Sequence, residues 1–341
     1  RDIDFFKALN ASGINKDKIS AFSSTRRAKT TCETDPVIKA LLEAEVPNLI
    51  VFGKTWDLHV TEALGITLEQ NLELIADTIA YLKKYADRVY FDAEHFFDGY
   101  RANPNYALKI VQTAQEAGAD TVILCETNGG RMPDEVSAAC EAVKGMVGDF
   151  PIGIHAHNDC ELAVANSIAA ILAGAEHVQG TINGVGERCG NANLCSIIPN
   201  LQLKYGYDCI SAEQLRELRD VSQFVNELGN LSQNPKQAYV GKSAFAHKGG
   251  VHVSAIMKNP ETYEHIKPEL VGNKQRVLLS DLSGKSNLLY KAKEFGLDID
   301  SNSETVTNIL NKLKTMENQG YEYEGAEASF ELLILSALNK L

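Results

Sequence analysis

The sequence predicts an α/β fold, a TIM-type (β/α)8 barrel followed by a mostly helical C-terminal region. Three observations support this prediction. Short apolar segments alternate with longer amphipathic segments up to about residue 206. Each apolar segment begins with apolar residues and ends with polar or charged ones. Beyond residue 206 the alternation stops, and helical patterns surround a region rich in Gly, Lys and His.

The alternating segments are expected to form six strand–helix units. The expected strands are residues 18–24, 48–54, 88–94, 120–127, 151–158 and 177–183. The expected helices are residues 36–44, 68–85, 104–117, 133–147, 160–174 and 193–205. Several of them open with helix-starting residues, such as Asp35 before Pro36. Repeated strand–helix units imply a parallel sheet covered by helices.

A doubly wound open sheet would give the same alternation, and the polar strand ends separate the two folds. Successive segments end in Arg26, Lys54, Glu94, Thr127, His157 and Asn183 or close neighbours of these residues. A barrel gathers its chemistry from many strand ends, whereas an open sheet uses one or two loops. We therefore favour the barrel. It needs eight strands, so the first two are expected to precede residue 1, which is Arg rather than Met.

Three regions are expected along the chain. Residues 1–206 would form the catalytic barrel with its strands 3 to 8, residues 207–283 a linker and lid-like subdomain, and residues 284–341 a small helical subdomain. Helical patterns in the last two regions cover residues 211–228, 287–295, 303–316 and 326–341.

Composition narrows the class of protein. The net charge of −12 argues against a nucleic-acid partner, because such partners require basic patches. The sequence has no apolar run of 18 residues, so no membrane span is expected. The seven Cys are odd in number and form no C-x-x-C pair, which is typical of reduced thiols in a cytoplasmic enzyme.

The most specific local pattern is His155-Ala156-His157 at the end of an apolar segment. Residues i and i+2 of a strand point to the same face, so both imidazoles should project together at the barrel mouth. We favour a divalent metal site over a hydrogen-bonded pair of core histidines. Oxygen ligands from neighbouring strands would have to complete the site.

A glycine-rich loop, residues 184–193, follows the next expected strand. Its glycines do not match the G-x-G-x-x-G dinucleotide pattern. A tight loop at the barrel mouth that presents Glu187, Arg188 and Asn191 fits better, although Asn191 or Asn193 could also cap the following helix.

Three further segments keep two or more interpretations open. Asp92 and Glu94 share a strand face and could serve as a general base, as metal ligands or as partners of Arg26. Thr127 suits a carboxylate or carbonyl substrate but also a helix cap. The segment 244–252, with His247, Lys248 and His252 in its sequence AFAHKGGVH, could be a lid or a solvated loop.

These motifs together resemble one enzyme family. HAHND at 155–159, NGVGERCGNAN at 183–193 and AFAHKGGVH at 244–252 are similar to motifs of the isopropylmalate, homocitrate and citramalate synthases. The resemblance runs along essentially the whole chain. KTWDLHV at 54–60, FDAEHFFDGY at 91–100, LCETNGG at 124–130 and the stretch from YEHIKPELVGN at 263–273 to SDLSGKSN at 280–287 most resemble the citramalate synthase branch.

The resemblance implies a transferase that condenses acetyl-CoA, as co-substrate, with a 2-oxo acid. Pyruvate is favoured, giving citramalate and CoA in amino-acid biosynthesis. A divalent metal (Zn, Mn or Mg) would act as a Lewis acid. Other 2-oxo acids, as in 2-isopropylmalate and homocitrate synthases, and a metal-dependent lyase running the reverse cleavage are the alternatives. The family also implies a homodimer in the cytoplasm.

The resemblance also implies roles for individual residues. The metal ligands would be His155, His157 and Asn191. The 2-oxo acid would contact Thr127 and His59, and we expect Arg26 to join them. The catalytic residues would be Glu94, His252 and Tyr263, the last two from a neighbouring subunit. The sequence departs from the family in lacking an Arg-Asp-Gly first strand and in having Glu126 where relatives often have Asp.

Overall fold

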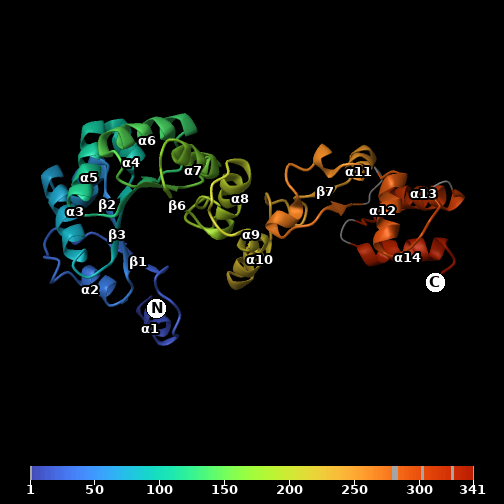
Figure 1. The fold of residues 1–341 in the computed structure, drawn as a ribbon, viewed down its shortest axis with the longest axis horizontal. Helices are drawn as coiled ribbons and strands as arrows, with labels where there is room; N and C mark the ends of the chain where they lie inside the picture. The colour runs from blue at the N-terminus through green and yellow to red at the C-terminus, as the bar shows by residue number, and fades with distance from the viewer. Residues whose placement is uncertain (1, 279–282, 301–302, 324–325, 341) are drawn as a thin grey trace. The chain divides into compact units, whose positions relative to one another are not determined.

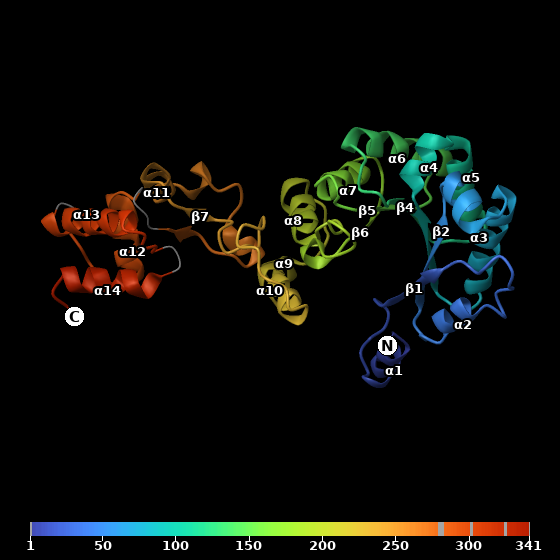
Figure 2. The same ribbon diagram turned by 180° about the vertical axis from the view of Figure 1, so that it is seen from behind.

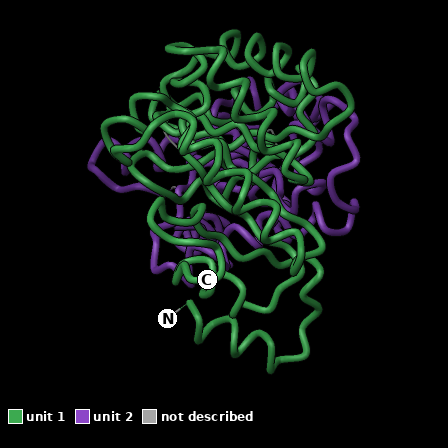
Figure 3. The backbone as a smooth tube through the Cα atoms, turned by 90° about the vertical axis from the view of Figure 1, so that its left-hand side faces the viewer, with its two compact units in different colours: residues 1–197 green, residues 198–341 purple. Residues whose placement is uncertain are grey.

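The computed structural model describes residues 2–278, 283–300, 303–323 and 326–340. The chain divides into two compact units, residues 1–197 and 198–341 (Figure 3). Residues 280–282, which begin the last stretch of the family resemblance, lie outside the described residues. So does Leu341, the last residue of an expected helix.

Unit 1 is built on a six-stranded parallel sheet whose strands follow one another in chain order from β1 to β6. The strands are β1 (Ser20–Ser24), β2 (Asn48–Lys54), β3 (Arg88–Glu94), β4 (Thr121–Glu126), β5 (Ile152–Ala156) and β6 (His177–Gln179). Figures 1 and 2 show the sheet curving under a layer of helices. Unbroken chain order is that of a barrel, since a doubly wound sheet reverses its order at a switch point.

Apart from α1, which precedes β1, the helices of unit 1 follow the strands, as expected. They are α1 (Asp2–Ala11), α2 (Pro36–Leu42), α3 (Leu68–Leu82), α4 (Phe96–Ala102), α5 (Pro104–Glu116), α6 (Pro133–Val147) and α7 (Ala163–Leu172), with a π-helix η1 (His59–Leu64) and a 3-10 turn η2 (Ile182–Gly184). Local capping explains several starts. The Asp35 carboxylate accepts the first backbone N–H groups of α2, and Thr67 forms a capping box with Gln70 at α3.

The expected strand bounds hold for β2 and β3, whereas β5 and β6 end earlier than expected. After Ala156 the backbone leaves the strand, and the N–H of Asn158 donates to the carbonyl of Gly190 at 2.9 Å. After Gln179, Gly180 lies so close to the glycine-rich loop that a Cβ there would be 2.6 Å from the carbonyl oxygen of Ala192. Loop contacts therefore replace the sheet ladder at both strand ends. The helices α4 and η1 were not predicted from the sequence pattern.

Unit 2 contains the remaining elements, and α8 (Leu194–Lys204) crosses the boundary between the units. The expected helix 211–228 is two helices, α9 (Ala212–Arg216) and α10 (Leu218–Leu228), which meet at Glu217. The region rich in Gly, Lys and His holds β7 (Ala246–His247), β8 (Arg276–Val277), α11 (Gly250–Ile256) and the short 3-10 turns η3 (Pro260–Thr262) and η4 (Pro268–Val271).

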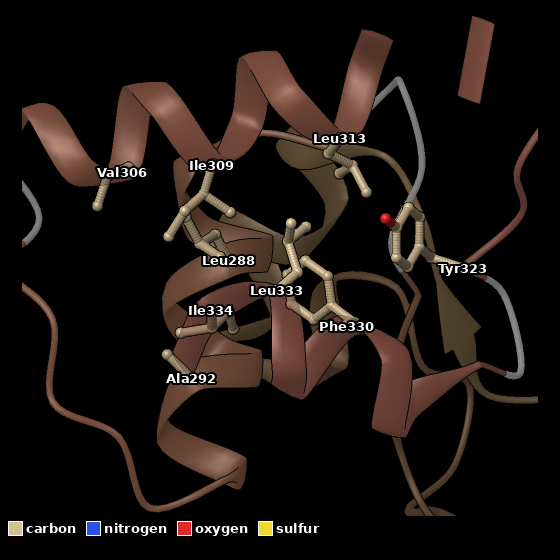
Figure 4. Close-up of a cluster of buried hydrophobic side chains, with 9 residues drawn as sticks. All are labelled: Leu288, Ala292, Val306, Ile309, Leu313, Tyr323, Phe330, Leu333 and Ile334. Atoms are coloured by element: carbon tan, nitrogen blue, oxygen red, sulfur yellow. The ribbon is translucent and has the colours of Figure 1, made fainter. Parts of the chain in front are cut away.

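Three helices close the chain: α12 (Lys285–Glu294), α13 (Glu304–Asn318) and α14 (Glu327–Ala337). They pack around a shared apolar core (Figure 4). The buried side chains of this core are Leu288, Ala292, Val306, Ile309, Leu313, Tyr323, Phe330, Leu333 and Ile334. Residues three or four apart on each helix supply the core, as amphipathic helices do. Throughout the described residues, every helix is too short or too polar to cross a lipid bilayer.

Candidate active site

His155 and His157 lie side by side at the end of β5. Their rings stack with centroids 5.2 Å apart and planes 27° apart. His155 is within the strand, and His157 follows it, bridged by backbone pairing to Asn191 of the glycine-rich loop. The two-residue spacing and the loop therefore bring the three residues expected to bind a metal into one place.

The orientation of His155 is fixed by a side chain from the neighbouring strand. Gln179 stands opposite His155 in the sheet register, and its Oε1 lies 2.7 Å from His155 Nδ1. The Gln179 amide nitrogen donates to Asp92 at 2.9 Å, so its oxygen accepts the Nδ1 proton of His155. In the neutral imidazole this leaves a lone pair on Nε2.

That lone pair faces a second acceptor. His155 Nε2 lies 3.3 Å from Asn191 Oδ1, while the Asn191 amide nitrogen is directed to the carbonyl of Val185 at 3.4 Å. Two acceptor atoms at this separation repel each other unless a proton or a cation lies between them. A divalent cation bound by both atoms is one arrangement that satisfies this geometry.

His157 has the protonation state that metal binding requires. Burial, together with the neighbouring His155 and Arg188, lowers its pKa to about 4, so the imidazole is neutral near pH 7. Its Nδ1 is buried and has no hydrogen-bond partner among the described residues. Within those residues, no group of three or more His, Cys, Asp and Glu is placed to hold a metal. A metal here would thus depend on two imidazoles and the Asn191 oxygen, with further oxygens completing its sphere.

Asp92 holds Gln179 in place by accepting its amide hydrogen bond. Its side chain is buried within β3, and burial raises its pKa to about 6, although His155 and the Gln179 hydrogen bond oppose the shift. The role of Asp92 stayed open in the sequence pattern, and Gln179 was not among the predicted site residues. A register alignment of the two strands would have indicated Gln179, because it pairs directly with His155.

Glu94, two residues beyond Asp92, pairs with Lys54. The two residues are neighbours in the register of β2 and β3, and their side chains form an ion pair at the strand ends. Both side chains are about one-fifth exposed, at 22% and 23%. The ion pair with Lys54 holds the Glu94 carboxylate at the strand ends, where a general base would act.

His59 and Thr127 are joined through His95. The His59 ring lies 5.1 Å from Trp56 and 4.3 Å from His95, centroid to centroid. Burial, together with the neighbouring His95 and Lys54, lowers the pKa of His59. The backbone N–H of His95 donates to the Thr127 hydroxyl at 2.9 Å. These two predicted substrate-binding residues therefore belong to one network.

A buried carboxylate holds this network together. Asp98 accepts from Arg131 at 2.9 Å and from Asn128 at 2.8 Å, and its other contact is His95 Nδ1 at 3.0 Å. Burial alone would raise the Asp98 pKa, but the His95 and Arg131 hydrogen bonds hold it below its ordinary value. Asp98 and Arg131 were not among the predicted site residues. The His95-x-x-Asp98 spacing at a helix start was the available signal.

The glycine-rich loop closes over the strand ends, as expected. A Cβ on Gly190 would lie 2.0 Å from the Gly184 carbonyl oxygen, so the loop can form only with glycine there. Arg188 makes a two-point contact with Asp159 at 2.8 and 3.0 Å and donates to the Thr127 carbonyl at 2.7 Å. The helix-cap interpretation also holds, because Asn193 Oδ1 accepts the Cys195 N–H at 2.9 Å.

Three predicted site residues stand apart from these contacts. Arg26 follows β1, and its guanidinium binds Asp77 of α3 at 2.5 Å and the Thr30 carbonyl at 2.9 Å. His252 and Tyr263 belong to unit 2, where their rings stack with centroids 4.1 Å apart. The roles expected for all nine site residues stay predictions.

Comparison with known proteins places these features in context. The HMGL-like family model matches residues 17–225, and the "homocitrate synthase post-HMGL domain-like" model matches residues 239–321. The chain is 59% identical to a protein named (R)-citramalate synthase from Geobacter sulfurreducens, over 99% of this chain and 64% of the relative. It is 54% identical to one of the same name from Aquifex aeolicus, over 98% and 63%. The chain thus spans somewhat less than two thirds of these relatives.

Among solved structures, hydroxymethylglutaryl-CoA lyase from Pseudomonas aeruginosa is similar in fold. The TM-score is 0.55 at 18% identity, covering 67% of this chain and 75% of the lyase. At this identity the likeness concerns the fold alone. It agrees with the curled parallel sheet and its outer helices, and with the family match it confirms the predicted barrel-type fold.

Proposed function

Because this chain belongs to the HMGL-like family, we propose that it carries the catalytic part of an enzyme that condenses acetyl-CoA with pyruvate, giving citramalate and CoA. The observation that carries this proposal is the high identity, over nearly the whole chain, to two proteins named (R)-citramalate synthase. The convergence of His155, His157 and Asn191 at the strand ends supports it independently.

The site fits a divalent metal. His155 Nε2, His157 and Asn191 Oδ1 would hold it, and when bound it supplies Lewis-acid polarisation of the 2-oxo acid's ketone. Zn, Mn and Mg all remain compatible with imidazole and oxygen ligands. Gln179 and Asp92 hold the His155 ring so that its Nε2 stays directed at Asn191.

The substrate carboxylate would lie against Thr127. The Thr127 oxygen already accepts the His95 N–H, so its own proton remains available to donate to an anion. His59, held neutral beside it, offers a further polar contact without adding charge. Arg26 is our third candidate contact, which would require its guanidinium to leave Asp77.

The catalytic step requires a base that removes a proton from the acetyl-CoA methyl group. We assign this step to His252 aided by Glu94, with Tyr263 stacked on His252. The resulting carbanion attacks the ketone carbon and forms the new C–C bond, and the ketone oxygen takes up a proton. Water then cleaves the thioester C–S bond and releases CoA as the free thiol.

The assembly remains part of the proposal. Residues 1–206 form the catalytic barrel region, residues 207–283 a linker and lid-like subdomain that carries His252 and Tyr263, and residues 284–341 a small helical subdomain. We propose a cytoplasmic homodimer in which one subunit supplies these two residues to the other subunit's site.

The test is CoA release by the full-length protein. Acetyl-CoA is mixed separately with pyruvate, 2-oxoisovalerate and 2-oxoglutarate, the free thiol is measured, and the product is identified by mass spectrometry. We expect release with pyruvate only, its loss after chelation, and its recovery when Zn, Mn or Mg is restored. Release with 2-oxoglutarate instead would favour the homocitrate synthase alternative, to which the second family match points. Cleavage without net condensation would favour a lyase.

A further inference from the structure

Unit 2 contains a buried carboxylate–imidazole pair that the proposed reaction does not use. His247 Nε2 lies 3.3 Å from Glu264 Oε1, and the two side chains are only 10% and 4% exposed. Removing two such groups from water costs most of what their attraction gains, so a pair of this kind contributes little net stability. It can, however, fix one geometry for the segments that carry its members.

His247 lies in the two-stranded sheet formed by β7 and β8. His247 ends β7 opposite Val277 of β8, and its carbonyl accepts the Leu278 N–H at 2.9 Å. Val277 is fully buried against Val253 and Ile256 of α11. The same two-stranded sheet therefore anchors both the His247 imidazole and the helix that presents His252.

The glutamate of the pair lies in the turn that presents the tyrosine. Tyr263 and Glu264 are adjacent at the end of η3, and both backbone N–H groups donate to the Pro260 carbonyl, at 3.1 and 3.0 Å. The Glu264 side chain is buried on His247, whereas Tyr263 is 46% exposed. Glu264 is thus a buried anchor beside an exposed ring.

The exposed Tyr263 ring contacts His252, the other residue that unit 2 is predicted to supply to the catalytic site. The Tyr263 ring stacks on His252 with centroids 4.1 Å and planes 25° apart, and it meets the edge of His247 at 6.4 Å. A stack between two exposed rings is weak by itself, because both surfaces are well hydrated and the side chains lose rotational freedom. The turn must already hold Tyr263 in place for the stack to persist.

We propose that Glu264 and His247 are positioning residues that hold Tyr263 against His252. The proposal rests on the proposed function, in which His252 and Tyr263 take part in the chemistry. Glu264 and His247 themselves touch neither substrate. They set where the two catalytic side chains stand, and a displacement of about 1 Å at such groups can lower turnover by about 100-fold.

The test uses Glu264→Leu, Glu264→Gln and a matched control in the full-length protein. Leu fills the buried space but cannot accept from His247, whereas Gln keeps an acceptor oxygen. Glu269→Gln is the control, since Glu269 is an exposed carboxylate on the same surface pocket with no contact to His247. The histidine ring protons are followed by NMR, with the His252 signals assigned from their loss in His252→Gln.

In the wild type, the Tyr263 ring current should displace the His252 signals from those of an exposed histidine. We expect Glu264→Leu to abolish this displacement and to lower kcat by roughly 10- to 100-fold, with the KM for pyruvate within about twofold. Glu264→Gln should keep most of the ring-current displacement and most of the wild-type kcat. Glu269→Gln should change neither the displacement nor kcat. The unfolding temperature of each variant separates misplacement from loss of fold.

The proposal is overturned if Glu264→Leu, folded as judged by its unfolding temperature, keeps the displaced His252 signals or keeps a kcat within twofold of the wild type. A wild type that released no CoA with any 2-oxo acid would overturn the proposed function instead. In that case the NMR comparison alone would still decide whether Glu264 holds Tyr263 against His252.

Discussion

Replacing Gly190 by Ala should disable the candidate metal site through the backbone alone. Gly190 adopts φ of +99°, which L side chains rarely adopt, and its Cβ would lie 2.0 Å from the Gly184 carbonyl oxygen. Since real Cβ contacts are essentially never under 3.0 Å, the loop must shift by about 1 Å. The next residue is Asn191, whose Oδ1 faces His155 Nε2.

The expected magnitude follows from that displacement. Backbone strain at an unfavourable φ costs about 1–3 kcal/mol of folding stability. A shift of about 1 Å in a ligand atom is expected to lower kcat by about 100-fold and to weaken metal binding. The assays are metal titration by calorimetry, CoA release and thermal unfolding in the full-length protein.

The matched control is Gly130→Ala. Gly130 also follows a strand of the sheet, but its added Cβ would meet no atom within 4 Å. Its backbone N–H donates to Glu126 at 3.1 Å, and alanine keeps that donor. We therefore expect near-wild-type values from Gly130→Ala. If Gly190→Ala bound metal and turned over like the wild type, the inference that this loop places Asn191 would be refuted.

Three further predictions concern single side chains. His157→Ala should abolish CoA release while thermal unfolding and acetyl-CoA binding change little; unchanged turnover would remove His157 from the site. Burial raises the pKa of Glu126 to about 7, so this carboxyl binds its proton more tightly in the folded chain than in the unfolded chain. The folding stability that the protonated carboxyl contributes below its unfolded pKa should therefore be lost as the pH rises to 7. Urea unfolding of Glu126→Gln should show a weaker decline between pH 4.5 and 7 than the wild type, and equal declines would contradict the assignment. Arg188→Lys should lower kcat/KM by roughly 10-fold, because lysine cannot reproduce the two-point contact with Asp159. The free energy of unfolding should change by less than about 1 kcal/mol, because the pair is exposed. Wild-type kinetics in this variant would argue that the loop needs no such contact.

The strand–helix alternation and the pairing of His155 with His157 could be predicted from the local sequence pattern. Both depend on local geometry: alternate residues of a strand share a face whatever the rest of the chain does. The bounds of β2 and β3 could also be predicted locally, because their apolar runs end in charged residues. The glycine-rich loop was also recognisable, since its backbone permits few other residues.

The side chains that surround these histidines depend instead on how the strands pack together. The chain from Asp92 through Gln179 to His155 joins three different strands, so it depends on sheet register rather than on spacing in the sequence. The His95 contact to Thr127 likewise crosses between neighbouring strand ends. Hydrogen-bond partners far apart in sequence are selected by packing, which a local pattern does not contain. That is why the sequence could name candidate metal ligands but not the side chains that hold them in place.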